Sequence, residues 1–352
     1  MELAMSRQAS EPPTRNHTWI VRLVVGVVTV VFDDCDLKEH VGNRRTVPTK
    51  RLLEKRTFFG DSATNKREGN DPHQGVHRLG LTVVLALSAF LNLSWLTREE
   101  YANVYYAATV KNMLASWHNF FFASFDAGFV SVDKPPLGFW IQTASAYLFG
   151  FHGWSLLLPQ ALAGVLCVAL LYHLVRRSFG PVAGLLAALT LALAPISVAT
   201  NRHNNLEGLL VLAVLLAAWA FVLAVETGRL RWLVVGALVV GVGFNIKMLE
   251  AFVVLPAFYL VYLVAAQVSW RRRIIHLGLA TVVILAASLP WVVAVDLTPA
   301  DQRPYVGSSS FNTVTDLIVG WNGVGRLVGS DTGVGDPAPL RLLNRQLAGQ
   351  IG

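Results

Sequence analysis

The stretch SVDKPPLGFW, residues 131–140, brings an acidic and a basic residue together in front of two prolines and an apolar segment. The pair is Asp133 and Lys134, and a second acidic residue, Asp126, precedes it across the short turn AGFVSV. Two carboxylates in a loop with apolar flanks can act as general acid or base, or can hold a divalent cation. Two plainer interpretations are a solvated turn and a surface ion pair, which contributes about 0–1 kcal/mol.

A second polar cluster, NRHNNLEGLL at residues 201–210, joins two apolar runs. Asn204 or Asn205 can cap the helix that follows, and Glu207 is favourable in its first turn. Capping does not explain the basic residue Arg202. A cation beside a helix N-terminus at a membrane surface is suited to bind phosphate, so this cluster is a second candidate site.

A third polar cluster interrupts an apolar run at residues 244–252, FNIKMLEAF. Lys247 and Glu250 are three residues apart, the spacing of a simple ion pair on a helix surface. The alternative is that Lys247 supplies a further cation for an anionic headgroup. The spacing alone leaves both interpretations open.

These candidates are rare polar positions in an apolar chain. Of the 352 residues, 54% are hydrophobic and 14% are charged, against about 25% charged residues in an ordinary soluble domain. Several apolar runs reach about 20 residues, the length an α-helix needs to cross a hydrocarbon core. Since backbone groups in lipid must pair within the protein, we predict an all-α protein that spans the membrane several times. The net charge of +7 comes without a basic patch interleaved with aromatics, so no nucleic-acid partner is expected.

The order of the spans depends on one short segment, 137–150. If it lies along the membrane, the arginine-rich loops at 176–180, 227–231 and 269–274 all become cytoplasmic, and if it crosses, they all become external. The positive-inside rule therefore predicts a juxtamembrane helix on the external face, with the Pro-Pro pair suited to its first turn. The expected spans are about 79–96, 154–175, 181–199, 206–225, 232–247, 251–268 and 275–295.

This topology places the three polar clusters on one side of the membrane, in external loops at 97–153, 200–205 and 296–352. Ionisable residues at the ends of membrane helices are costly unless they have a partner or a function. Within the first loop, the apolar periodicity of residues 99–116 predicts a helix. Arg98, Glu99, Glu100, His118 and Asp296 carry no motif and are interpreted as solvated loop residues.

The two flanks differ from the membrane core, which we assign to residues 78–296. Residues 1–77 are polar and basic and are expected to be poorly ordered. The short apolar segment Trp19–Phe32 within them is interpreted as a surface helix, as a stretch not native to the fold, or as a signal anchor. Residues 297–352 are expected to form an external loop of an incomplete C-terminal region. Cys35 and Cys167 are far apart in the chain, so no disulfide is expected, and Cys167 is interpreted as a small core residue.

The segment YANVYYAATVKNMLASWHNFFFASFDAGFVSVDKPPLGFW resembles the first external loop of ArnT-like and protein-mannosyltransferase-like membrane glycosyltransferases, the GT-C, family 39 type. RHNNLEGLL and GFNIKMLEAFVVLPA resemble the next two external segments, so the resemblance covers about 78–350. It implies a GT-C bundle of membrane helices with juxtamembrane helices on the external face. Asn103 lies near the position of an acidic residue in the wider family, and Glu207 stands where Asp is common.

The resemblance implies an enzyme that transfers a sugar, hexosyl or pentosyl and mannosyl-like, from a polyprenyl-phosphate donor to an acceptor hydroxyl at the external face of the cytoplasmic membrane. The acceptor would be a lipid, a glycan or a protein. Asp126 is the first choice for the general base and Asp133 the second. Lys134, Arg202 and Lys247 would stabilise the leaving phosphate. The remaining residues expected to bind substrate are Asn103, Tyr106 and Glu207.

A lipid-linked donor needs no nucleotide site, so no cofactor is expected except a divalent cation held by Asp126 and Asp133. Two alternatives stay open. A transporter or flippase for an amphiphilic anion would also place cations at helix ends, but it would show inverted repeats and helices broken near the midplane. The abrupt C-terminus is also compatible with an inactive fragment of such an enzyme.

Overall fold

The computed structural model describes residues 72–325. The predictions for the segment Trp19–Phe32, for Cys35 and for the residues after 325 lie outside this range. Within it the chain is almost entirely helical, as predicted, and a single two-stranded hairpin belongs to a loop.

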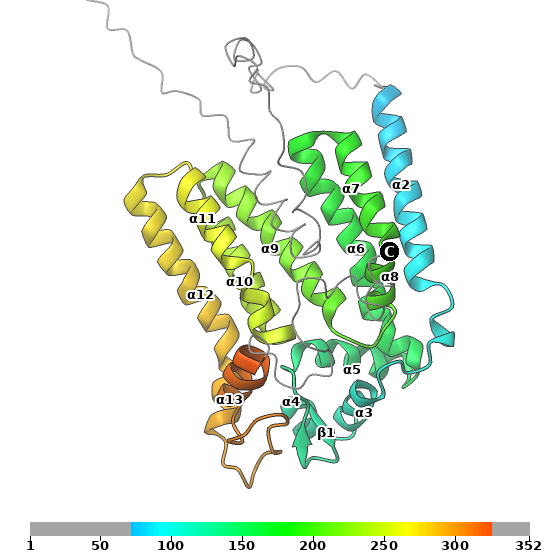
Figure 1. Cartoon of the computed structure of the whole chain (residues 1–352), viewed down its shortest axis with the longest axis vertical. Coiled ribbons are helices and arrows are strands. Elements are labelled where there is room, and N and C mark those ends of the chain that lie inside the picture. The colour runs from blue at the N-terminus through cyan, green and yellow to red at the C-terminus, as the bar shows by residue number, and fades with distance from the viewer. Residues whose placement is uncertain (1–71, 326–352) are drawn as a thin grey trace, which may run out of the picture.

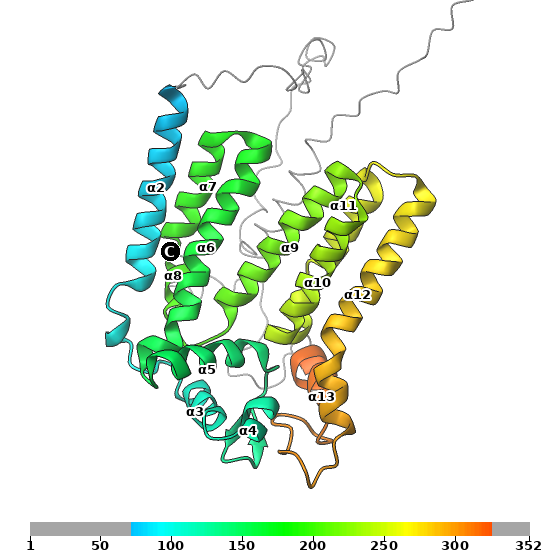
Figure 2. The ribbon, with the colours of Figure 1, turned by 180° about the vertical axis from the view of Figure 1, so that it is seen from behind.

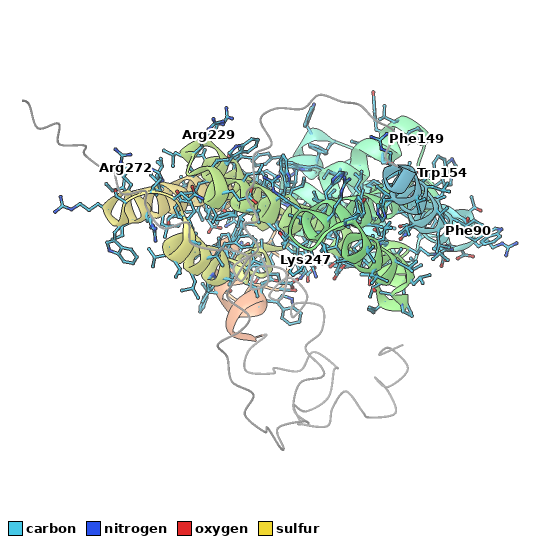
Figure 3. The ribbon with its side chains drawn as sticks, turned by 90° about the horizontal axis from the view of Figure 1, so that it is seen from above. Phe90, Phe149, Trp154, Arg229, Lys247 and Arg272 are labelled. Carbon is cyan, nitrogen blue, oxygen red and sulfur yellow. The ribbon has the colours of Figure 1, made fainter. Side chains whose placement is uncertain are left out.

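Within residues 72–325, five apolar helices are long enough to cross a membrane, and they form the bundle drawn in Figure 1. They are α2 (Pro72–Leu93), α6 (Gly153–Phe179), α9 (Glu207–Thr227), α10 (Leu230–Lys247) and α12 (Trp270–Leu297). Seen along the bundle in Figure 3, the helices form an elongated cross-section with α2 and α12 at opposite edges. These five confirm the predicted spans at 79–96, 154–175, 206–225, 232–247 and 275–295.

The predicted span 181–199 is divided into two helices, α7 (Pro181–Leu193) and α8 (Pro195–Asn201), which are bent by 59°. The bend lies at Ala194, whose ψ of 115° is extended. A proline clashes with a helical conformation of the residue before it, so Pro195 ends the first helix. The predicted span is therefore present as a bent pair of apolar helices, which by length and composition can form one broken span or a re-entrant loop.

The predicted span 251–268 is also wrong in length. It contains α11 (Leu255–Ala265), a helix of 11 residues that is about 16 Å long at 1.5 Å per residue. The preceding residues form the 3₁₀ turn η2 (Met248–Phe252), which begins with Met248 at φ 50°. Because the chain turns here, α11 packs beside α9 and α12 but does not reach across a hydrocarbon core of about 30 Å.

The short elements gather at one end of the bundle (Figure 1). In chain order they are η1 (Leu96–Arg98), α3 (Val104–Met113), α4 (Trp117–Phe122), β1 (Ser124–Asp126), β2 (Val130–Ser131), α5 (Leu137–Phe149), α13 (Val314–Val319) and the π-turn η3 (Gly320–Val324). Helix α5 lies crosswise beneath the long helices, as expected of a juxtamembrane helix. The predicted helix 99–116 is shorter, because a turn over 99–102 precedes α3.

Close contacts between small residues hold the long helices together. A Cβ atom on Gly241 of α10 would lie 2.5 Å from the Cβ of Ala287 and 2.9 Å from the carbonyl oxygen of Ile284, both on α12. Asn245 Nδ2, one turn further along α10, donates to the carbonyl oxygen of Ala287 at 2.8 Å. Glycine and alanine thus let the two backbones meet, a common way of packing membrane helices. Cys167, 3% exposed, lies in the same core, as predicted.

The bundle has two ends that differ in composition, seen from behind in Figure 2. The loop end carries the short elements together with the connections α8–α9 and α10–α11. The arginine end carries the connections α6–α7, α9–α10 and α11–α12, with Arg176, Arg177, Arg229, Arg231, Arg271, Arg272 and Arg273 in or next to them. The loops predicted to share a membrane side therefore lie at the same end of the molecule.

Candidate active site

Lys134 lies between β2 and α5 and is buried, with 3% of its surface exposed. Its Nζ donates to Asp133 Oδ2 at 2.9 Å and to Asn322 Oδ1 at 3.1 Å. An ammonium group withdrawn from water is costly unless it is paired and hydrogen-bonded, so Lys134 depends on both partners. The interpretation of Asp133 and Lys134 as a surface ion pair is wrong.

The two prolines lead this pair directly into α5. Pro136 precedes the first residue of the helix with nearly helical angles, φ −80° and ψ −25°, and its carbonyl oxygen accepts from the Trp140 N–H at 2.8 Å. Two residues on, a Cβ atom on Gly138 would lie 2.6 Å from Leu206 Cδ2. The start of α5 therefore packs against the residue that precedes Glu207, and the first two polar clusters become neighbours.

Asn322 of η3 joins the site from the far end of the described chain. Besides accepting from Lys134, its Nδ2 lies 3.3 Å from the carbonyl oxygen of Asp133 and 3.2 Å from Met248 Sδ. One amide group thus contacts the acidic residue, the lysine and the residue after Lys247. No sequence motif marked Asn322, because its partners are 188 and 189 residues away.

The segment that carries Asn322 is docked on the first loop by backbone pairing. The Ser131 N–H donates to the Tyr305 carbonyl oxygen at 2.9 Å, and the Tyr305 N–H donates to that of Phe129 at 2.8 Å. Asp296 accepts from the Val314 and Thr315 N–H groups at 2.6 and 3.0 Å, so it orients the start of α13. The interpretation of Asp296 as a solvated loop residue is wrong.

Asp133 has one carboxylate oxygen in use and one free. Oδ1 is buried and has no hydrogen-bond partner among the described residues. The Asp133 N–H donates to the Tyr105 hydroxyl at 3.3 Å. Burial, with the nearby negative charge of Asp133, raises the pKa of Tyr105 to about 12. Tyr105 is therefore a neutral phenol at any physiological pH. Because Oδ1 of Asp133 has no partner in the described range, it can accept a proton or a hydrogen bond from a ligand.

Lys247 forms a second charged centre at the loop end. Its Nζ lies 2.6 Å from Glu207 Oε1 and 3.0 Å from Glu250 Oε2, and 12% of its side chain is exposed. The predicted pair with Glu250 is present, but Glu207 from the second cluster joins it. Glu207 Oε2 is buried without a partner in the described part of the chain. This centre, like the first, keeps a free acceptor.

Arg202 does not join either centre. Its guanidinium donates to Glu99 Oε1 at 2.7 and 3.1 Å, and to the carbonyl oxygens of Leu91 and Ser94 at 2.8 Å each. Those carbonyls lie at the end of α2, where a helix leaves acceptors unpaired. The structure thus gives Arg202 a role in fixing α2 to α8, and Glu99 is its partner rather than a solvated residue.

Asn103 and Asn204 have structural partners that the sequence did not assign. Asn103 Oδ1 caps α3 by accepting from the Tyr105 and Tyr106 N–H groups at 3.1 and 3.3 Å. Asn204 does not cap α9, because the residue at that position is Leu206. Asn204 is instead fully buried, and its Oδ1 accepts from Gln142 Nε2 at 2.8 Å. Capping of α9 by Asn204 or Asn205 is therefore wrong, whereas Glu207 does begin α9.

Tyr106 and Asp126 flank the centre in different ways. The Tyr106 ring packs edge-on against Phe139, with centroids 5.0 Å apart. Asp126 ends β1, is exposed, and its carboxylate makes no hydrogen bond or ion pair within residues 72–325. The structure therefore brings Asp133 and Lys134 together but gives Asp126 no contact with them. No three His, Cys, Asp or Glu side chains come together in the described range as metal ligands would.

Comparison with known proteins agrees with the family resemblance of the loop over residues 101–140. Residues 133–292 match the family described as dolichyl-phosphate-mannose-protein mannosyltransferase. Two proteins of Bacillus subtilis (strain 168) are similar: "Putative mannosyltransferase YkcB", 48% identical over 76% of this chain, and "Putative mannosyltransferase YycA", 49% identical over 72%. The chain spans 38% and 37% of their lengths.

A solved structure, ArnT from Cupriavidus metallidurans bound to undecaprenyl phosphate, superposes with a TM-score of 0.51 and 26% identity. The match covers 64% of this chain and 42% of that one. Sequence and fold thus confirm the resemblance found in the first loop. The chain is thus similar, in sequence and in fold, to the ArnT-like and protein-mannosyltransferase-like membrane glycosyltransferases of GT-C type.

Proposed function

We propose that the protein transfers a sugar from a polyprenyl-phosphate donor to an acceptor hydroxyl, at the loop end of the bundle. The observation that carries the proposal is the buried cluster of Asp133, Lys134 and Asn322. It has a cation and a free carboxylate oxygen, and a pair of prolines connects it to the start of α5. The ArnT structure with undecaprenyl phosphate supports the class of donor. The relatives' names support a sugar such as mannose, and the acceptor is a lipid, glycan or protein.

In this mechanism Lys134 binds the donor phosphate. Attack by the acceptor oxygen on the anomeric carbon forms the new glycosidic bond and breaks the bond between that carbon and the phosphate oxygen. The electron pair leaves with the polyprenyl phosphate, where Lys134 stabilises the developing charge. The acceptor proton passes to a carboxylate. Asp133 is favoured for this role over Asp126, because Oδ1 of Asp133 is buried, lacks a partner and belongs to the residue beside Lys134.

Lys247 is the second cation of the proposed site. Its two carboxylate partners can reorient toward solvent, since the Glu207 and Glu250 side chains are 37% and 42% exposed. An incoming phosphate or sugar can then accept hydrogen bonds from Lys247 Nζ, while the free oxygen of Glu207 accepts one from a sugar hydroxyl. Asn103 and Tyr106 contribute through α3, which supports Asp133. Arg202, with its donors engaged by Glu99 and the end of α2, is assigned a supporting role.

The loop end is proposed to face the outside of the cytoplasmic membrane. The arginine clusters at the opposite end support this orientation, because such clusters are retained on the cytoplasmic side. The active site would then meet donors whose tails lie in the outer leaflet. Single-cysteine labelling at Ser178 would test the orientation, with an impermeant reagent and intact cells, in a background without Cys35 and Cys167. Labelling from outside would reverse the assignment.

The test of function is transfer from a radiolabelled polyprenyl-phosphate sugar by the purified chain in detergent. Lys134→Met should lower kcat/KM for the donor by about 10²–10³-fold, the loss expected when one preorganised stabilising group is removed. Lys111→Met is the matched control, because Lys111 is an exposed lysine on α3 at the same end. Equal activity in the two variants would contradict the proposal.

A further inference from the structure

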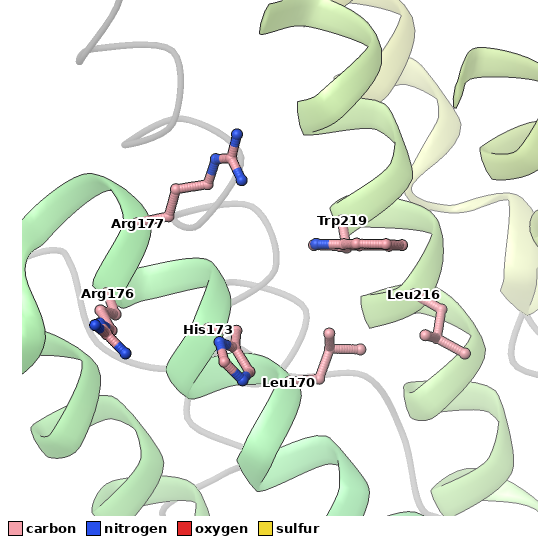
Figure 4. Close-up of a pocket in the computed structure, with 6 residues that line it drawn as sticks. All are labelled: Leu170, His173, Arg176, Arg177, Leu216 and Trp219. Atoms are coloured by element: carbon pink, nitrogen blue, oxygen red, sulfur yellow. The ribbon is translucent and has the colours of Figure 1, made fainter. Parts of the chain in front are cut away.

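A groove opens between α6 and α9 near the arginine end, far from the charged centres at the loop end. Its cavity volume is about 470 Å³. Figure 4 shows Arg177 and Trp219 on opposite sides of the gap between the two helices. The lining residues are Leu170, His173, Arg176 and Arg177 from α6 and Leu216 and Trp219 from α9. Nothing in the proposed transfer reaction uses them.

The residues that line the groove change from charged to apolar with distance from the arginine end. Arg177 and Leu170 are seven residues apart on α6, about 10 Å along the axis at 1.5 Å per residue. On α9, Leu216 lies one turn deeper than Trp219, and 38% of its surface is exposed. The groove therefore has charged groups at the level of the helix ends and an apolar, open wall toward the bundle centre.

Charge at the mouth of the groove is mainly positive. Arg177 makes a bidentate ion pair with Glu226 of α9, and the two side chains are 46% and 35% exposed. The Arg176 guanidinium lies 5.7 Å from the centre of the Tyr172 ring and has no hydrogen bond to the described residues. Every other acidic residue of the described range belongs to the loop end. The Arg176 guanidinium therefore has no acidic partner in the described range, and from its place on the side of α6 away from Trp219 (Figure 4) it must turn to reach an anion in the groove.

Trp219 belongs to a pair of tryptophans on α9 and α10. Its ring packs edge-on against Trp232 of α10, with centroids 5.5 Å apart, and Arg231 lies 5.3 Å from the centre of the Trp232 ring. Tryptophan and arginine together are typical of the region where lipid headgroups meet hydrocarbon. Basic pockets between membrane helices at this level are suited to phospholipid phosphates.

We propose that this groove binds one anionic phospholipid, with its phosphate between Arg176 and Arg177 and its acyl chains along Leu170 and Leu216. Guanidinium groups are well matched to phosphate oxygens. Arg177 exchanges part of its pairing with Glu226 for the phosphate. The lipid fills the gap between α6 and α9 and so links two helices of the bundle.

The experiment is native mass spectrometry of the chain released from nanodiscs of phosphatidylcholine with phosphatidylglycerol, counting the lipids that stay bound. The wild-type chain should retain phosphatidylglycerol, and the double variant Arg176→Gln, Arg177→Gln should retain about tenfold less. The matched control is Arg271→Gln, Arg272→Gln, since both residues are exposed at the same end but lie outside the groove.

A third variant predicts a change in the other direction. Glu226→Gln removes the competing carboxylate from Arg177, so retention of phosphatidylglycerol should rise above wild type, which misfolding would not produce. Equal losses in the two double variants would mean that general surface charge attracts the lipid, and would overturn the site. Retention of phosphatidylcholine as strong as that of phosphatidylglycerol would overturn the role of the arginines.

Discussion

The two ends of the bundle treat charge in opposite ways. At the loop end Lys134 is 3% exposed, and the Lys247 and Arg202 side chains are 12% and 18% exposed, each with an acidic partner. At the arginine end, the one ion pair, Arg177 with Glu226, is 46% and 35% exposed, and other described arginines there have no acidic partner. Water solvates most of the second group, although Arg273 also donates to the carbonyl oxygens of Leu263, Val264 and Val268. The protein must solvate the first group.

We interpret this difference as the contrast between a surface that orients the chain in the membrane and the proposed binding surface. Exposed arginines cost little and need no partner geometry. Buried ionic groups are costly, and Asp133 beside Lys134 and Glu207 beside Lys247 each have one carboxylate oxygen that is buried and free in the described part of the chain. An unsatisfied acceptor is unfavourable in the empty protein, and a ligand hydroxyl removes that cost. The predictions below test which loop-end charges belong to the binding surface.

The largest effect is expected from the acidic residues. Asp133→Asn keeps the shape of the side chain but removes the proposed base, so turnover should fall by about 10²–10⁴-fold. Asp126→Asn should stay within about threefold of wild type, because the exposed carboxylate has no partner at the site. Initial rates at saturating donor separate the two.

If Asp126→Asn is the slower variant, the base is the residue first chosen from the sequence and the buried pair only binds. If both stay active, the loop-end mechanism fails. Adding a divalent cation to Asp133→Asn gives a further check, because partial rescue would indicate that the carboxylate holds a metal ion.

Asn322→Ala should have an intermediate effect. It removes an acceptor from Lys134 Nζ and a donor near the Asp133 carbonyl, and hydrogen bonds to charged groups contribute about 1.5–3 kcal/mol. Donor KM should rise about tenfold with a smaller change in kcat, because the lysine loses its position but not its charge.

Asn322→Asp is the companion variant. It keeps an oxygen that can accept from Lys134 but loses the Nδ2 donor. The KM for the sugar donor should therefore be closer to the wild-type value than in Asn322→Ala. A purely structural role would instead lower the yield of folded protein in both variants and leave donor KM of the folded fraction unchanged.

Arg202→Lys should lower stability rather than activity. The guanidinium makes four hydrogen bonds that a lysine cannot reproduce, and they join α2 to the segment after α8. We expect a loss of about 1–3 kcal/mol, seen as a lower Tm in detergent, with turnover per folded molecule changed less than twofold. A large rise in donor KM at unchanged Tm would return Arg202 to the phosphate site.

The smallest effect concerns Tyr105 at high pH. Because its folded-state pKa is raised from 10.0 to about 12, the folded protein keeps a proton that the unfolded chain loses between those values. Stability should therefore fall as pH rises through that window. Tyr105→Phe should lose less stability than the wild-type chain as the pH rises from about 10 to about 12. Tyr147→Phe, at an 81% exposed position, should behave like wild type.

The sequence predicted the membrane class, five spans and the crosswise α5 because each depends on local apolar length and on arginine placement. It missed the break at Ala194 and the shortness of α11, where Pro195 and the turn at Met248 interrupt an otherwise apolar stretch. Pro195 and the polar residues at 247 and 250 are the sequence signals that indicate these two breaks.

The site was predicted in part. The neighbours Asp133 and Lys134 and the spacing of Lys247 and Glu250 are local, so they could be read directly. The joining of Glu207 to Lys247, of Glu99 to Arg202 and of Asn322 to Lys134 depends on helices packing over 40, 103 and 188 residues of chain. No pattern within one segment encodes such contacts, and ion pairs look alike in sequence whether they are exposed or buried.

The crosswise position of α5 has a consequence for the bilayer itself. Its last turn exposes Tyr147, Leu148 and Phe149 by 81%, 72% and 50%, and its first turn follows the proposed phosphate-binding lysine. In the proposed topology one end of α5 lies in lipid and the other carries the proposed site, so a change in hydrocarbon thickness would change the tilt of α5 or the local lipid packing. We therefore expect the rate of transfer to pass through a maximum as the acyl chains of the host membrane are lengthened, which would make the enzyme sensitive to membrane thickness.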